Sequence, residues 1–138
     1  MLVEFERVDE EMEVVGQLLA RKLETVNETS AARTITSADY GKTIFLNYEG
    51  AVAITLPANG AAAGSWFEFV IDGTDNCAPT FSAATANTLL TFNNKTTCDS
   101  VTFGSGHRIG AYIRFISTGS VWVATSLSGL ATMTVTTA

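Results

Sequence analysis

The alternation of apolar and polar residues between positions 34 and 58 constrains the fold more than any other feature of this chain. In residues 52–56, Val-Ala-Ile-Thr-Leu, large apolar side chains fall on every second position, which is the period of a half-buried strand. Gly41 and Gly50 stand in turns where a positive φ is often needed, and Pro57 cannot donate to a strand ladder. This pattern predicts antiparallel β structure, with strands at residues 34–36, 43–47 and 52–56.

Further segments with strand character follow, with one strand expected every eight to twelve residues. Residues 66–71 are apolar on both faces, which predicts burial on both, either inside the domain or at a subunit interface. Gly119 and Ser120 predict a hairpin between residues 108–117 and 121–125. Other short strands are expected at residues 80–83, 88–92 and 100–103, and residues 133–137 are expected to form a last strand or a frayed tail. The sequence therefore predicts a mainly β fold, an antiparallel sandwich or barrel over residues 31–138.

Residues 1–30 differ from the rest of the chain and form a separate acidic arm in this interpretation. They carry eight acidic and three basic residues, a net charge of −5, whereas residues 31–138 carry six and five, a net charge of −1. Apolar residues recur three and four positions apart, which predicts an amphipathic helix followed by a linker. The apolar seam consists of Phe5, Val8, Met12, Val15, Leu19 and Val26.

The apolar seam of this arm could be buried in more than one way. Its apolar face could pack on the β domain of the same chain, as the faces of most globular helices do. It could instead form a three-stranded bundle or dock onto a larger assembly, because so short a helix is marginal in water unless its stripe is buried. Residues 2–5 could alternatively extend and add an edge strand to a partner.

Charge and hydropathy exclude several classes of partner. The net charge is −6 and the pI about 4.6, which argues against nucleic-acid binding through clustered Lys and Arg. No apolar run approaches the length of a membrane span. Glu4, Glu6 and Arg7 stand where a signal peptide would carry its apolar region, so synthesis and assembly in a cytoplasm are expected.

Candidate catalytic and metal-binding residues are few. Ser105 and His107 lie two residues apart in a glycine-rich loop, a poor arrangement for a nucleophile and its base, and no nucleophile-elbow motif is present. A second cluster, with Asp72, Asp75 and Asn76, lacks the later bidentate glutamate of a calcium loop. Cys77 and Cys98 are expected to be free thiols in a reducing cytoplasm. The sequence thus predicts no catalytic, metal or cofactor site, and no enzyme.

Several of these segments together resemble a β module found in virion proteins of tailed bacteriophages. They are T-x-x-D-x-G-K-T-x-x-L-N from Thr36, I-T-L-P-A after Gly50, the aromatic strand from Trp66 and the late Gly119-Ser120-Val121-Trp122. The similarity extends from about Thr34 to the C-terminus. Modules of this kind occur in capsid decoration proteins and in head and tail fibre proteins, where they are usually trimeric and non-enzymatic.

The resemblance implies a virion structural protein, a capsid decoration (cement) protein or short head fibre, that acts as a homotrimer. Its partners would be two further copies of itself and the major capsid protein, and its location the capsid surface. Together with the seam of the arm, Trp66, Phe67 and Phe69 are the expected interface residues. The alternative is a tail-fibre or adhesion module that binds host-surface carbohydrate on aromatic side chains.

Overall fold

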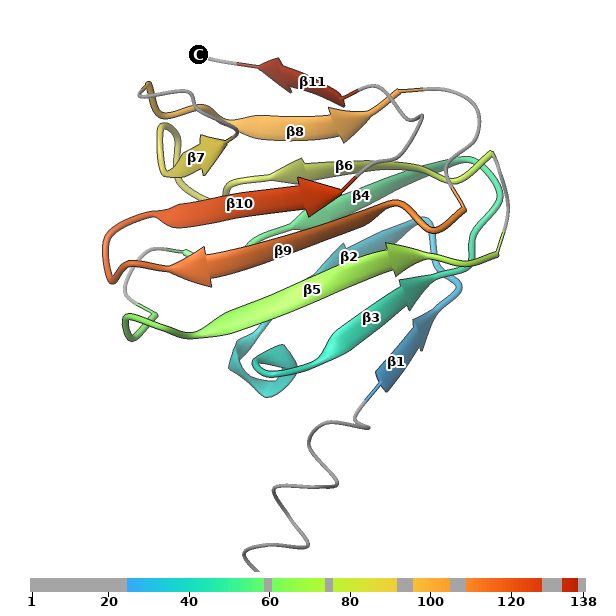
Figure 1. Ribbon diagram of the computed structural model, residues 1–138, viewed down its shortest axis with the longest axis horizontal. Coiled ribbons are helices and arrows are strands. Elements are labelled where there is room, and N and C mark those ends of the chain that lie inside the picture. Colours follow the sequence, from blue (N-terminus) through green and yellow to red (C-terminus); the bar gives the residue numbers. More distant parts are fainter. Residues whose placement is uncertain are drawn as a thin grey trace, which may run out of the picture.

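The computed structural model describes residues 25–58, 61–73, 76–91, 96–104, 109–127 and 133–136 (Figure 1). Within them the protein is mainly β, with one short 3₁₀ helix, η1 (Ser37–Asp39). The first strands are β1 (Thr25–Glu28), β2 (Ala32–Thr34), β3 (Thr43–Leu46), β4 (Ala51–Thr55), β5 (Trp66–Ile71) and β6 (Ala78–Ser82). They are followed by β7 (Leu89–Thr91), β8 (Ser100–Phe103), β9 (Tyr112–Ser117), β10 (Trp122–Leu127) and β11 (Met133–Thr136). The described part of the chain contains no helix long and apolar enough to cross a membrane.

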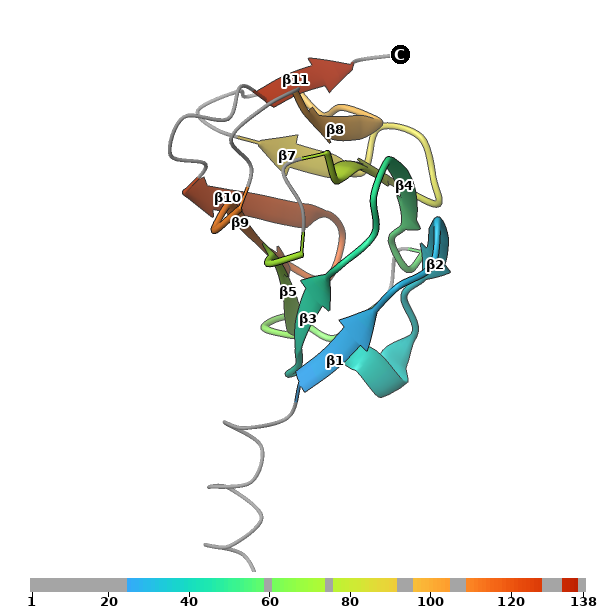
Figure 2. The same ribbon diagram turned by 90° about the vertical axis from the view of Figure 1, so that its right-hand side faces the viewer.

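These strands form two sheets that lie face to face (Figures 1 and 2). Sheet A has the strand order β1-β3-β5-β9-β10-β7, and sheet B has the order β11-β8-β6-β4-β2. From β1 to β9 the chain changes sheet at every strand, so that β1, β3 and β5 are neighbours in sheet A and β2, β4, β6 and β8 are neighbours in sheet B.

The early strands are parallel, which corrects the antiparallel prediction. In sheet A, β1 pairs with β3 and β3 with β5, while in sheet B β2 pairs with β4 and β4 with β6, all in parallel. The chain therefore coils through both sheets, and each parallel pair is connected through a strand of the other sheet. The turn around Glu49 and Gly50, expected to be tight, is a corner between sheets and does not close a hairpin. A short polar turn suits either geometry, which is why the sequence pattern did not distinguish them.

The later strands are mostly antiparallel and close the coil. β9 pairs with both β5 and β10, and the predicted hairpin around Gly119 joins β9 to β10. In sheet B, β8 pairs with β6 and β11 with β8, also antiparallel. Sheet A ends in a further parallel pair, β10 with β7. Both sheets are therefore mixed.

An aromatic cluster fills the space between the sheets. Phe81 of sheet B has its ring centroid 4.9 Å from that of Phe69 and 5.3 Å from that of Phe115, both in sheet A. The ring centroid of Phe103, in the neighbouring strand β8 of sheet B, lies 5.7 Å from that of Phe81. Trp122 is buried at one end of this cluster, where its indole N–H donates to the carbonyl oxygen of Pro57 at 3.0 Å. Aromatic contacts thus connect the two layers.

The segment before residue 30 contributes to sheet A. Val26 lies in β1, where its partner is Ile44, and is not the last position of a helical seam. β1 also precedes the boundary expected at residue 30, so the sheet includes residues that the sequence analysis assigned to the arm. The rest of the predicted helix, with Phe5, Val8, Met12, Val15 and Leu19, lies outside the described residues.

Two of the expected glycine turns have the predicted backbone. Gly41 has φ +78° and Gly50 has φ +122°, backbone conformations that residues with a side chain adopt only at a cost in energy. The helix η1 lies between β2 and Gly41. It begins with a capping box, in which the Asp39 carboxylate accepts a hydrogen bond from the backbone N–H of Thr36 at 3.0 Å. These turns place the corners of the coil.

Candidate functional site

The outer face of sheet A carries two apolar rows that the core does not use. The half-buried residues of these strands lie opposite one another across the sheet, as the strand register shows. The first row is Trp66, Ile116, Val123 and Leu90 on β5, β9, β10 and β7. The second row is Phe45, Val70 and Tyr112 on β3, β5 and β9. Large side chains on an outward face are typical of contact surfaces.

The outer face of sheet B provides a comparison within the same molecule. Its outward positions are occupied only by alanine, serine and threonine among the described residues. One row is Thr34, Thr55, Ser82, Ser100 and Thr136, and the next is Ala32, Ala53, Thr80, Thr102 and Thr134. This is the composition of a sheet face that remains in water. The apolar rows of sheet A are therefore not a general property of the fold.

A polar row lies between the two apolar rows, and its groups satisfy one another. Glu68 accepts from the Thr43 hydroxyl at 2.6 Å and from the Tyr112 hydroxyl at 2.8 Å. Its Oε2 atom also forms an ion pair with Nη2 of Arg114 at 2.7 Å. The guanidinium carbon of Arg114 lies 4.7 Å from the ring centroid of Trp66, a cation–π distance. The row connects β3, β5 and β9 and has no net charge.

Glu68 should make the stability of the protein depend on pH in acid. Burial alone would raise the pKa of Glu68, but the hydrogen bonds from Thr43, Arg114 and Tyr112 and the charge of Arg114 lower this pKa below its ordinary value of 4.5. A carboxyl group with a lowered pKa contributes stability above pH 4.5 and loses it as the pH falls through the folded-state pKa.

We therefore expect acid titration to destabilise the wild type more than Glu68→Gln, and the difference between them to shrink below pH 4.5. Denaturant midpoints measured at several pH values between neutral and acid would test this. An equal pH dependence in the two proteins would contradict it. Glu49, an exposed carboxyl group, provides the matched control as Glu49→Gln.

The expected interface residues of the aromatic strand point in opposite directions. Trp66 lies on the outer face of sheet A. Phe67 and Phe69 are 0% and 1% exposed and belong to the aromatic core. Burial on both faces within the domain, one of the two predicted alternatives, is thus wrong for β5. Its Trp66, Glu68 and Val70 face outward and are half-buried.

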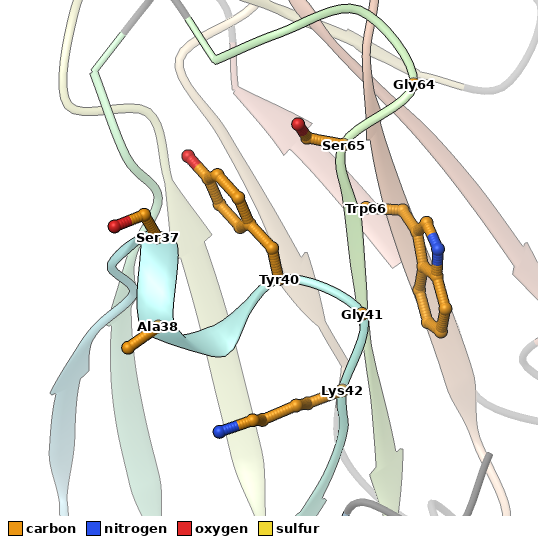
Figure 3. A pocket seen from close by; sticks show the side chains of 8 residues that line it. All are labelled: Ser37, Ala38, Tyr40, Gly41, Lys42, Gly64, Ser65 and Trp66. Atoms are coloured by element: carbon orange, nitrogen blue, oxygen red, sulfur yellow. The ribbon is translucent and has the colours of Figure 1, made fainter. Parts of the chain in front are cut away.

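A polar hollow of about 570 Å³ lies beside the start of β5. It is bordered by η1 on one side and by Gly64 and Ser65 on the other (Figure 3). Figure 3 shows the ring of Tyr40 between Ser37 and Ser65, whereas the indole of Trp66 points away from it. Burial raises the pKa of Tyr40, so its hydroxyl stays protonated and can donate. The hollow has the size of a small-molecule site and offers hydroxyl groups and the Lys42 ammonium.

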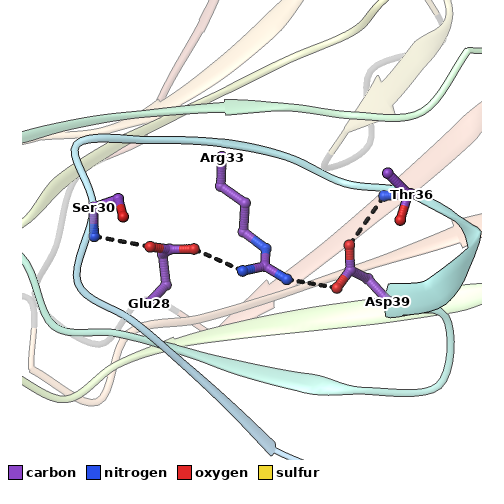
Figure 4. A network of polar contacts seen from close by, with 5 residues as sticks. All are labelled: Glu28, Ser30, Arg33, Thr36 and Asp39. Carbon is purple, nitrogen blue, oxygen red and sulfur yellow. Dashed lines mark hydrogen bonds and ion pairs between the residues drawn. The ribbon is translucent and has the colours of Figure 1, made fainter.

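An ion-pair network holds β1, β2 and η1 together at the start of the coil (Figure 4). Arg33 donates from Nη1 to Glu28 at 2.7 Å and from Nη2 to Asp39 at 2.6 Å. Glu28 also accepts from the backbone N–H of Ser30 at 2.8 Å. Both carboxylates are about nine-tenths buried, so the network fixes the geometry of this end of the fold.

The other candidate residues are not brought together. Cys77 and Cys98 are in the reduced thiol form, as expected, and both are buried; burial raises the pKa of Cys98. Asp72 is exposed, and Asn76 donates to Glu49 at 3.3 Å. Ser105, Asp75 and His107 lie outside the described residues. Within the part of the chain that is described, no group of His, Cys, Asp or Glu is arranged to hold a metal ion.

The apolar rows and the polar row between them were not identified from the sequence. One signal was present: β5 alternates, and Glu68 occupies the same face as Trp66 and Val70. Because glutamate is rarely found in a core, the face of β5 that carries Glu68 is expected to be the outer one. The pairing of Glu68 with Arg114 depends on the strand register and leaves no local signal.

A comparison with the models of known protein families finds no match to this chain, and a search of the curated proteins finds no relative.

Proposed function

We propose that this chain is a non-enzymatic virion structural protein of a tailed bacteriophage, a capsid decoration protein or short head fibre that binds the phage head as a homotrimer. The observation that carries an assembly role is the contrast between the two outer faces. Sheet A presents large apolar residues, and sheet B presents alanine, serine and threonine. The resemblance in the sequence supplies the virion context and the number of copies.

A protein of this kind acts by contact rather than by chemistry. Interfaces of proteins contain aromatic and aliphatic side chains at the centre and few unpaired charges. The outer face of sheet A has this composition, with its only ion pair, among the described residues, closed between Glu68 and Arg114. Several copies bound together would engage repeated sites on a capsid at once, so weak single contacts would add up to stable attachment.

Co-sedimentation with phage heads tests the proposal. The full chain would be added to heads of the encoding phage that were prepared without it. We expect saturable binding at a fixed number of copies per head and a higher temperature of head disruption. If the protein stays in the supernatant at concentrations well above those of the head sites, the decoration role is wrong.

A second candidate function is carbohydrate binding by an adhesion module, which the polar hollow favours. Its hydroxyl groups, from Ser37, Ser65 and Tyr40, and the ring of Tyr40 are the groups that a sugar contacts. Binding of the full chain to a glycan array, lost in Tyr40→Ala, would support it. Binding to heads without glycan binding would leave decoration as the function.

A further inference from the structure

We infer that copies of this chain meet each other through the outer face of sheet A, with the rows of Trp66 and Phe45 buried between them. The inference rests on the proposed homotrimer and names the surface that forms it. In Figure 1 the strands that carry this face, β5, β9 and β10, lie side by side in front of sheet B.

The electrostatics of the face suit a second copy as its occupant. Of the net charge of −6, residues 1–30 carry −5 and residues 31–138 only −1, so two β domains repel one another little. The outer face of sheet A is neutral, because Glu68 and Arg114 neutralise each other within one subunit at 2.7 Å. In a trimer, equal residues of the three copies approach one another around the three-fold axis, and on this face they would be apolar side chains and a closed ion pair. A charged partner would find no complementary charge in the described residues of the rows.

The carboxylate of the polar row can be buried without losing its partners. Both carboxylate oxygens of Glu68 accept hydrogen bonds within the subunit, from Thr43, Tyr112 and Arg114. Burial of a charged group is costly when its partners are missing, and those of Glu68 are supplied before the subunits meet. The Glu68 carboxylate is thus already organised for loss of water.

The face has the extent of a small interface. The six strands of sheet A contain 29 residues, and at about 3.3 Å per residue and about 4.8 Å between strands they cover on the order of 460 Å². This projected area is somewhat over half of the roughly 800 Å² that each partner contributes to a standard interface, and side chains add to the projection. The outer face of sheet B, with 21 residues in five strands, is smaller and lacks apolar anchors.

The test converts the outer face of sheet A to the composition of sheet B. The variant Val70→Thr, Ile116→Thr and Val123→Thr keeps β-branched residues on each strand and leaves the core unchanged. Solution mass would be measured by light scattering over a range of concentrations, with circular dichroism and a thermal melt to establish folding. We expect the wild type to be a trimer. The folded variant should dissociate at protein concentrations at least about a hundredfold higher than those at which the wild type dissociates.

A control on the other face and a cross-link make the result specific. Ala53→Thr with Ala78→Thr alters outward positions of sheet B and should leave the mass unchanged. Ile116→Cys should form a disulfide with the same residue of another copy under mild oxidation, whereas Thr80→Cys on sheet B should not. The native thiols Cys77 and Cys98 are buried and leave this readout clear. Should the triple variant fail to fold, the cross-link carries the test.

The outcomes separate this inference from the proposed function. A wild type that is monomeric, or a triple variant that is folded and still trimeric, would overturn the inference. Cross-linking through Thr80→Cys in place of Ile116→Cys would overturn it as well. If the chain binds phage heads as a monomer, the decoration role survives and the inference fails. If it trimerises through sheet A but does not bind heads, the inference survives and the decoration role fails.

Discussion

Phe81→Ala is expected to lower the free energy of unfolding by about 3–5 kcal/mol. Phe81 is 0% exposed, and its ring centroid lies 4.9 to 5.7 Å from those of Phe69, Phe103 and Phe115. Truncation would leave a cavity between the sheets, because strands on both sides are fixed by their ladders and cannot close it. Denaturant unfolding of the purified full chain measures the change.

Two further variants make the Phe81 result interpretable. Phe81→Leu retains much of the buried volume and should cost clearly less than the alanine variant, about 1–2 kcal/mol. Thr102 lies on the outer face of sheet B in β8, next to the strand of Phe81, and Thr102→Ala should change the free energy of unfolding by less than about 1 kcal/mol. If Phe81→Ala cost no more than Thr102→Ala, the aromatic cluster would not be what holds the two sheets together.

Arg33→Met is expected to destabilise the fold by about 2–4 kcal/mol, because it leaves Glu28 and Asp39 buried without their cation. The Arg33 side chain is 21% exposed, so solvent reduces the cost below that of a fully buried pair. Lys42→Met is the matched control. Lys42 lies on the adjoining segment, and its ammonium takes part in none of the ion pairs found in the described residues.

The stability of Arg33→Met should depend less on pH in acid than that of the wild type. Burial raises the pKa of Glu28, but hydrogen bonds from Arg33 and Ser30 and the charge of Arg33 lower this pKa below 4.5 overall. The wild type therefore loses the Glu28 contribution as the pH falls through the folded-state pKa. Without Arg33, two of the causes that lower the pKa of Glu28 are lost while burial still raises it, so the variant should lose less stability than the wild type as the pH falls.

Denaturant midpoints of the wild type and of Arg33→Met would be measured between pH 7 and pH 4. We expect the two midpoints to approach each other as the pH falls. A difference that stays constant over this range would show that the cost of Arg33→Met comes from lost packing rather than from unpaired charge.

The positions of most strands could be predicted from the sequence, whereas their pairing could not. Alternation and turn residues are local signals, and they placed β5 and β8 at their observed bounds. The direction of pairing is set by whether a corner folds back within a sheet or passes to the other sheet. The turn at Gly50 has the same residues in both cases. Parallel pairing of β3 with β5 therefore appears only in the assembled fold.

The strand β1 was missed because its signal is weak and its stabilisation is tertiary. Thr25–Glu28 contains one apolar residue, Val26, which also fits the helical spacing of the preceding segment. Glu28 is buried in the fold, where Arg33 reaches it from β2. The outer face of sheet A was not identified: Trp66 was predicted to be an interface residue together with Phe67 and Phe69, because the alternation alone did not say which face of β5 points inward.

The coiled path of the early strands makes this fold adjustable in length. Each turn of the coil is one strand of sheet A followed by one of sheet B, and it pairs only with the turns next to it. A turn added beside β1 and β2, which are edge strands, would continue both parallel ladders without changing any existing pair, and would lengthen the domain by about 4.8 Å in the stacking direction. Relatives built on the same coil could therefore differ by whole turns and span different distances between neighbouring subunits.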